Sequence, residues 1–158
     1  MIVLRSFGKF FGLAGLRLGF VFAHQQVRQA LQQKMGLWSV NGPAQYIAIK
    51  ALVDQQWQRQ ARIDIEQDAL YTRRIFAPLF DLLTPVRTQY QALFSSYWLA
   101  SNTAEVVTEF FAQRGILIRK ISVNDQLCLL RIGIMSQLDL SSQDRVKQTI
   151  QDFLFIEK

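Results

Sequence analysis

A chain of 158 residues, half of them hydrophobic, can build one domain with a sizeable core but not two full ones. The net charge of +6 describes solubility and non-specific attraction, and the basic residues are scattered, so we expect no nucleic-acid partner. The sequence shows neither a membrane-spanning apolar run nor a secretory signal, which predicts a cytoplasmic protein without a membrane contact.

The sequence gives little support for a metal site or an internal disulfide. The single cysteine, Cys128, cannot form an internal disulfide, and its apolar neighbours in QLCLLRIGI favour a buried structural thiol. The only histidine, His24, begins a polar segment and is expected to be exposed rather than catalytic. We therefore expect no metal site.

The first half of the chain predicts two strands followed by helices. MIVLRSF and LRLGFVFA are short apolar runs bounded by glycine-containing turns, which is typical of strands. A helix is expected from His24 to Met35, where Gly36 can stop it. After Pro43, apolar residues at helical spacing predict one long helix or a bent pair that runs towards Pro78.

Beyond residue 85 the pattern changes to a smaller α/β unit. TQYQALFSSYWLA is rich in strand-forming residues, and Asn102 with Glu105 has the spacing of a capping box that opens the helix TAEVVTEFFAQRG. ILIRKI and LCLLRIGI predict two more strands, and Ser141 or Ser142 is expected to begin a last helix. The sequence therefore predicts an α/β protein with an α+β C-terminal part.

The segment RSFGKFFGLAGLRLGF places a lysine where it can do chemistry. Lys9 follows an expected strand, with Ser6 three residues before it and Arg17 eight residues after it. A lysine that acts as a covalent catalyst must present an uncharged amine, and a phosphorylated cofactor needs a hydroxyl or a guanidinium at its anionic end. On spacing alone, a lysine and an arginine on a glycine-rich surface turn remain the simpler interpretation.

The same segment resembles the lysine segment of fold-type I pyridoxal-phosphate enzymes in the aminotransferase class I/II family. The positions that match the family pattern are Ser6, Lys9, Gly12, Gly15, Arg17 and Gly19. The resemblance implies pyridoxal 5'-phosphate as the cofactor. It further implies that Lys9 bonds the cofactor covalently and that Ser6 and Arg17 hold its phosphate.

The resemblance also implies a small amino-acid phosphate as the substrate. Arg131, in LLRIGI, stands where the family has an arginine for the substrate α-carboxylate, and a structural ion pair is the alternative. Asn41, in SVNGP, matches a region near the active site and the subunit contact. Arg119, in LIRKI, is a candidate for the substrate phosphate, with an exposed strand residue as the alternative.

Two reactions are compatible with the resemblance. The segments LRSFGKFFGLAGLRLGF and GLWSVNGPAQ are most similar to enzymes of cobalamin biosynthesis that decarboxylate threonine phosphate to aminopropanol phosphate. Transamination of the histidinol-phosphate type is the alternative, with Lys9 acting as a base. A third interpretation is a truncated fragment or interaction module without catalysis.

The resemblance covers only the C-terminal part of a family member. It implies that residues 1–45 are the remnant of the large cofactor-binding domain, residues 46–84 the long connecting helical segment and residues 85–158 the small α+β domain. The family's aspartate for the cofactor ring nitrogen lies upstream of this region, so we expect the chain alone to be inactive. We also expect a homodimer, because phenylalanines that would meet the large domain form a candidate patch: Phe10, Phe11, Phe20 and Phe22.

Overall fold

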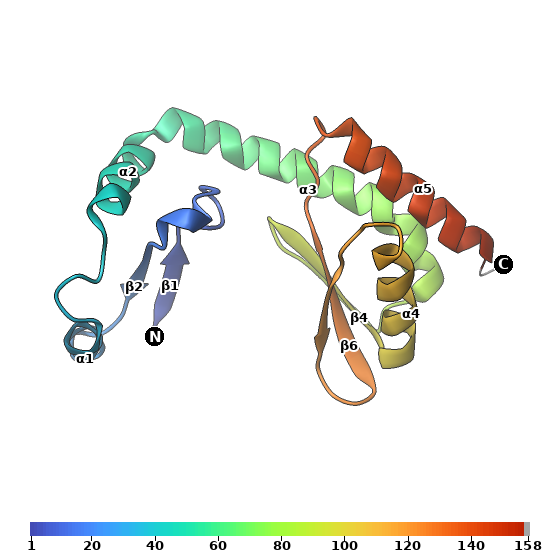
Figure 1. The fold of residues 1–158 in the computed structure, drawn as a ribbon, viewed down its shortest axis with the longest axis horizontal. Coiled ribbons are helices and arrows are strands. Elements are labelled where there is room, and N and C mark those ends of the chain that lie inside the picture. Colours follow the sequence, from blue (N-terminus) through green and yellow to red (C-terminus); the bar gives the residue numbers. More distant parts are fainter. Residues whose placement is uncertain (157–158) are drawn as a thin grey trace. The chain divides into compact units, whose positions relative to one another are not determined.

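The structure of the protein, a computed structural model, describes residues 1–156 and divides into two compact units (Figure 1). The first unit is Met1–Ala61, and the second begins at Arg62. Both contain helices and strands, which confirms the expected α/β class.

The first unit contains a two-stranded antiparallel ribbon and two helices. Strand β1 (Val3–Ser6) pairs with β2 (Gly19–Phe22), and the connecting loop contains the short 3-10 helix η1 (Ala14–Leu16). Helices α1 (Gln25–Met35) and α2 (Gly42–Val53) follow. The two expected strands and the expected first helix are confirmed.

Side chains fix the starts of the helices in this unit. The His24 ring accepts a hydrogen bond from the backbone N–H of Gln26, and Gly36, with φ of 72°, follows the last residue of α1. Asp54 separates α2 from α3 (Gln55–Leu83), and its carboxylate accepts a hydrogen bond of 3.0 Å from Trp57 N–H. The expected long helix is therefore a pair, because Asp54 leaves the helical conformation and caps the second member.

Helix α3 does not end at Pro78 but continues to Leu83. A proline inside a helix removes a hydrogen bond and costs about 3 kcal/mol. Leu79 and Phe80, directly after it, are buried in the core of the second unit. Burial of these two side chains stabilises the last turn by about the same amount, which explains why the proline does not stop the helix.

The second unit is a four-stranded antiparallel sheet with helices on one side (Figure 1). The strands are β3 (Arg87–Tyr90), β4 (Phe94–Ala100), β5 (Arg119–Ser122) and β6 (Leu127–Gly133), in the order β3-β4-β6-β5. Helices α4 (Ser101–Ala112) and α5 (Leu140–Ile156), with the end of α3, cover one face. The alternate residues of β4 and β6 that face these helices are buried: Tyr97, Leu99, Cys128, Leu130 and Ile132.

The other face of this sheet, which we call the open face, carries the residues between those buried positions. They include Gln89 on β3, Ser96 and Trp98 on β4, Leu129 and Arg131 on β6, and Arg119 on β5.

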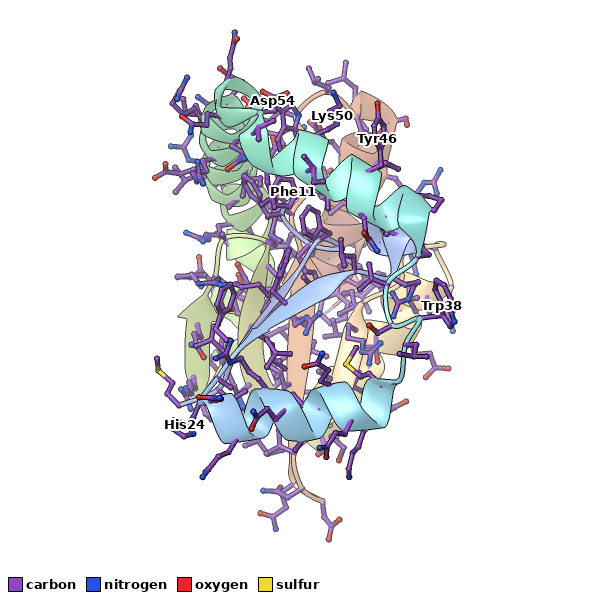
Figure 2. All side chains as sticks on the ribbon, turned by 90° about the vertical axis from the view of Figure 1, so that its left-hand side faces the viewer. Phe11, His24, Trp38, Tyr46, Lys50 and Asp54 are labelled. Atoms are coloured by element: carbon purple, nitrogen blue, oxygen red, sulfur yellow. The ribbon has the colours of Figure 1, made fainter. Side chains whose placement is uncertain are left out.

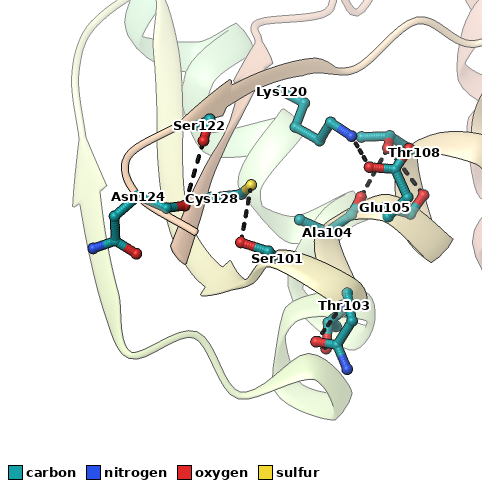
Figure 3. Close-up of polar contacts among 10 residues, drawn as sticks. Ser101, Thr103, Ala104, Glu105, Thr108, Lys120, Ser122, Asn124 and Cys128 are labelled. Carbon is teal, nitrogen blue, oxygen red and sulfur yellow. Dashed lines mark hydrogen bonds and ion pairs between the residues drawn. The ribbon is translucent and has the colours of Figure 1, made fainter. Parts of the chain in front are cut away.

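Two helix starts differ from expectation. The capping box is wrong: Ala100 precedes α4, whose first N–H, of Ser101, donates to the carbonyl of Gln126 at 2.9 Å. A contact with the sheet thus replaces a side-chain cap, and Glu105 instead pairs with Lys120 (Figure 3). The last helix begins at Leu140, before the expected serines, because the Asp139 carboxylate accepts from Ser142 N–H at 3.1 Å.

Cys128 is buried, as its apolar neighbours predict, and its Sγ lies 3.5 Å from Ser101 Oγ (Figure 3). Within residues 1–156, no helix is long and apolar enough to span a membrane. The same residues contain no group of three or more His, Cys, Asp and Glu side chains that could bind a metal ion.

Candidate cofactor and substrate site

The loop between β1 and β2 presents the candidate cofactor residues. Phe7 N–H donates to the Leu18 carbonyl at 3.2 Å, and Leu13 N–H donates to the Phe7 carbonyl at 2.9 Å, which closes the base of the loop. At its tip, Gly12 N–H donates to the carbonyl of Lys9 at 2.9 Å, and Gly12 has φ of 67°. Lys9 therefore lies on a tight exposed turn held by the ribbon.

Ser6 and Arg17 lie where the chain enters and leaves this loop. Ser6 Oγ accepts a hydrogen bond of 3.0 Å from Gly8 N–H, so its own proton is available for an anion. Arg17 has a left-handed backbone with φ of 53°, which costs about 1–2 kcal/mol for a residue other than glycine. Its guanidinium donates to the Ala14 carbonyl at 3.2 Å, and strained residues of this kind gather at functional sites.

Gly19 is needed for this geometry. A Cβ at this position would lie 2.6 Å from the carbonyl oxygen of Arg5 on the paired strand. Only glycine lets β2 begin beside the end of β1, where Gly19 pairs with Ser6.

The basic residues are spread evenly along the chain, as expected, but the acidic residues are not, so the net positive charge belongs to the part of the chain that contains this loop. Residues 1–53 contain six lysines and arginines and no aspartate or glutamate, whereas residues 54–158 contain twelve of each sign. Among the described residues, no carboxylate lies within ion-pair distance of Lys9 or Arg17. A hydroxyl, an amine and a guanidinium without counter-charge fit a phosphorylated cofactor such as pyridoxal phosphate.

Asn41 connects this loop to α2. Its side-chain oxygen accepts a hydrogen bond of 2.8 Å from Ala44 N–H, and its nitrogen donates to the Leu16 carbonyl at 3.4 Å. The side chain thus fastens the start of α2 beside Arg17. Its role in substrate binding stays a prediction.

In the second unit, Arg131 and Arg119 lie directly opposite each other on β6 and β5, on the open face of the sheet. The guanidinium of Arg131 stacks on the ring of Phe94, 4.2 Å from its centroid. No carboxylate in residues 1–156 pairs with Arg131, so the alternative of a structural ion pair finds no support. Like charges on opposite residues are unfavourable, and an anion between them relieves the repulsion.

Two further polar residues lie in line with Arg119 and Arg131, one on each of the remaining two strands of the sheet. Ser96 on β4 is opposite Arg131, and Gln89 on β3 is opposite Ser96. The sequence analysis missed both, because only the strand register places them beside Arg131. No alternation in β4 gave a signal, because Ser95, Ser96 and Tyr97 are all buried.

The structure therefore gathers the expected site residues into two groups. Ser6, Lys9, Arg17 and Asn41 belong to the loop and helix start of the first unit. Arg119 and Arg131 belong to one sheet face of the second unit.

Both units have the architecture of a fold-type I aminotransferase. The crystal structure of the histidinol-phosphate aminotransferase from Clostridium acetobutylicum matches with a TM-score of 0.73 and 19% identity, over 96% of this chain and 46% of that chain. Residues 1–141 match the family model described as aminotransferase class I and II. The chain belongs to this family, which implies pyridoxal phosphate as the cofactor.

Curated relatives carry two kinds of name. The chain is 38% identical over 139 residues to the threonine-phosphate decarboxylase of Pseudomonas aeruginosa, which is 85% of this chain and 38% of that protein. It is 26% identical over 133 residues to the histidinol-phosphate aminotransferase of Granulibacter bethesdensis, covering 84% of this chain and 35% of that protein. The chain thus spans less than half the length of these relatives.

Proposed function

We propose that this chain is the C-terminal portion of a pyridoxal-phosphate-dependent enzyme that decarboxylates threonine phosphate to aminopropanol phosphate. The observation that carries the proposal is the β1–β2 loop, which presents Ser6, Lys9 and Arg17 with no carboxylate partner in residues 1–156. The threonine-phosphate decarboxylase of Pseudomonas aeruginosa, 38% identical, supports the choice of reaction.

The cofactor, when bound, supplies an electron sink for the bond that breaks at the substrate α-carbon. Lys9 would hold the cofactor through its amine. The Ser6 hydroxyl would donate a hydrogen bond to the cofactor phosphate, and the Arg17 guanidinium would neutralise its charge.

Arg131 and Arg119 suit a substrate with two anionic groups. The Arg131 guanidinium, oriented by the Phe94 ring, forms a two-point hydrogen-bonded pair with the α-carboxylate. Arg119, on the facing strand, neutralises the substrate phosphate. An amino-acid phosphate carries both groups, whereas a neutral amine would leave two facing cations unpaired.

Transamination of the histidinol-phosphate type is the second candidate, since that enzyme shares the fold and a curated member shares 26% of the matched sequence. In this reaction the Lys9 amine acts as a base that removes the proton from the substrate α-carbon. The same amine, then protonated, gives the proton back to another atom of the substrate and cofactor. The third interpretation, a non-catalytic module, requires that the loop bind no cofactor.

The organisation of the complete enzyme is part of the proposal. Residues 1–45 belong to the large domain, residues 46–84 form the connecting helical segment and residues 85–158 form the small domain of a cytoplasmic enzyme of cobalamin biosynthesis. We expect a homodimer. In the candidate phenylalanine patch, Phe20 and Phe22 are exposed, whereas Phe10 and Phe11 are half-buried against Trp57. Trp38 and Tyr46 are further exposed aromatic residues that could join the contact (Figure 2). The chain alone is expected to be inactive.

Reductive labelling tests the cofactor site in this chain. Borohydride treatment with pyridoxal phosphate should modify Lys9 well ahead of Lys34 and Lys50, as read by peptide mass spectrometry. The variant Lys9→Arg should lose this label, and the matched variant Lys34→Arg should keep it. Equal labelling of all lysines would contradict the proposal.

A further inference from the structure

The phenylalanines on either side of Lys9 are in ring contact with one another. Phe7, two residues before Lys9, is 2% exposed, and its ring stacks on that of Phe11 with 4.7 Å between the ring centroids. Phe10, directly after Lys9, meets the Phe11 ring edge-on at 5.1 Å. Aromatic pairs prefer particular distances and angles, so each ring restricts the position of the next.

Trp57, the third residue of α3, contacts the two phenylalanines that follow Lys9. Its ring stacks on that of Phe11, with 5.7 Å between the centroids and 14° between the planes, and meets the Phe10 ring edge-on at 5.6 Å. All of these residues belong to the first unit. A side chain from a distant segment of the chain therefore packs against the residues beside the lysine.

Polar contacts at the start of α3 fix the backbone of Trp57. Its N–H donates to the Asp54 carboxylate at 3.0 Å. The side-chain nitrogen of Gln58 donates to the carbonyls of Ala51 and Leu52, each at 3.0 Å, which joins the start of α3 to the end of α2. Trp57 is thus held at the junction of the two helices.

The lysine turn needs a support of this kind. The loop contains Gly8, Gly12 and Gly15, and glycine has more conformational freedom than any other residue. The hydrogen bond from Gly12 N–H to the Lys9 carbonyl fixes the shape of the turn, but it does not fix where the turn lies relative to α2 and α3. The ring contacts with Trp57 supply that restraint.

A general hydrophobic core is the simpler explanation of an aromatic cluster, and the exposed fractions argue against it. Trp57 is 43% exposed, and Phe10 and Phe11 are only half-buried. Rings at the surface contribute less to stability through burial than rings in a closed core. What distinguishes these rings is their place, because two of them directly follow the lysine.

We propose that Trp57 is a positioning residue for Lys9. Its ring holds Phe10 and Phe11, and through them it keeps the Lys9 amine where it bonds the cofactor. The inference rests on the proposed function, in which Lys9 bonds pyridoxal phosphate. A displacement of a reacting group by about 1 Å lowers a rate by as much as about 100-fold, so ring contacts beside the lysine are sufficient to affect its reaction.

The test is reductive labelling of the 158-residue chain with pyridoxal phosphate and borohydride, with the label on Lys9 measured relative to that on Lys34. The amine and the aldehyde lose water to form a C=N bond, and hydride from borohydride reduces it to a stable amine. Trp57→Ala should lower the ratio of Lys9 label to Lys34 label about tenfold. Trp57→Phe, which keeps an aromatic ring, should restore most of the ratio.

The matched control is Phe155→Ala, which removes an aromatic ring that is 82% exposed in the second unit. This variant should leave the labelling ratio unchanged, because the ring lies outside the unit that contains Lys9.

Amide hydrogen exchange without the cofactor separates positioning from general stability. In Trp57→Ala, exchange should become faster at Gly12 and Leu13, whose N–H groups donate within the loop. The amides of β1 and β2 should keep their protection, because loss of a local contact opens only the segment that depends on it.

The outcomes distinguish this inference from the proposed function. An unchanged ratio in Trp57→Ala, with Lys9 labelled ahead of Lys34 in the original chain, would overturn the inference and leave the proposed function standing. Equal labelling of Lys9 and Lys34 in the original chain would overturn both. Faster exchange throughout β1 and β2 in Trp57→Ala would make Trp57 a structural residue only, and a Trp57→Phe variant as impaired as Trp57→Ala would rule out the ring contact as the cause.

Discussion

The two units of this protein bury their hydrophobic side chains to different extents. The second unit buries a cluster of fifteen residues between its sheet and three helices. The first unit buries only three hydrophobic residues, Phe7, Ala44 and Ala48, within the described part of the chain. Its larger apolar side chains are exposed or partly exposed, which is unfavourable unless something else covers them.

This difference shows that an apolar sequence does not by itself make a core. In the second unit, alternate residues of β4 and β6 point at helices that the same segment of chain provides. In the first unit, the ribbon has apolar residues on both faces, and Leu4, Phe20, Val21 and Phe22 among them remain exposed. The second unit encloses a core of its own, and the first unit leaves most of its apolar side chains exposed or half-buried.

The largest expected effect comes from the core of the second unit. Phe111→Ala should destabilise this unit by about 3–5 kcal/mol, because the buried ring leaves a cavity. The matched change Leu4→Ala in the first unit should alter stability by less than about 0.5 kcal/mol in the isolated chain. Urea unfolding followed by circular dichroism measures both, and equal losses would contradict the contrast between the units.

Two glycine substitutions, one in each unit, extend the comparison to the backbone. Gly19→Ala should disrupt the ribbon by about 1–3 kcal/mol, because the new methyl group meets the Arg5 carbonyl. Gly133→Ala, at the end of β6, should be tolerated, because no atom lies within 4 Å of its added Cβ. Hydrogen exchange of the amides of residues 3–6 and 19–22 measures the effect. Unchanged amide protection in Gly19→Ala would contradict the close approach of position 19 to the Arg5 carbonyl.

High pH tests the burial of the second unit alone. Burial raises the pKa of Tyr97 to about 12 in the folded protein, above its usual value of 10.0. The folded state therefore keeps the neutral phenol, and its stability is full below pH 10 and falls as the pH rises towards 12. Tyr97→Phe should lessen this fall, as measured by urea titrations at pH 9 to 11.5. If the free energy of unfolding falls with pH as steeply in the variant as in the original protein, the prediction is wrong.

The smallest expected effect concerns helix caps. Asn41→Ala should destabilise α2 by about 1 kcal/mol, because the cap on Ala44 N–H is lost. Asn102→Ala should have a smaller effect, since Asn102 lies inside α4 and its side-chain oxygen accepts only from the adjacent Thr103 N–H, at 2.8 Å. Nuclear magnetic resonance shifts of the first turn of each helix report both changes, and equal responses would show that Asn41 is not the cap.

Much of the local structure could be predicted. The strands around Lys9, the helix beginning after His24, the buried Cys128 and the hairpin of β5 and β6 follow from short-range patterns. These features depend on neighbouring residues, so a sequence contains their signals. The capping box at Asn102 failed because Ser101 N–H donates to the carbonyl of Gln126, which lies in the distant turn between β5 and β6.

The candidate site also has features that the sequence shows and features that only the structure shows. The residue types and spacing of Ser6, Lys9 and Arg17 are visible in the sequence, and the family comparison supports their resemblance. The facing positions of Arg119 and Arg131 are not visible, because strand register depends on the packing of both strands.

The sequence by itself determined the family, the mixed α/β class and the lysine motif, because these depend on residue type, spacing and local periodicity. Only the tertiary structure decided that α3 continues through Pro78 and which residues share the open face with Arg131. It also decided that one unit closes its own core while the other leaves its ribbon uncovered. These outcomes depend on contacts between distant segments, and no local pattern of residues contains them.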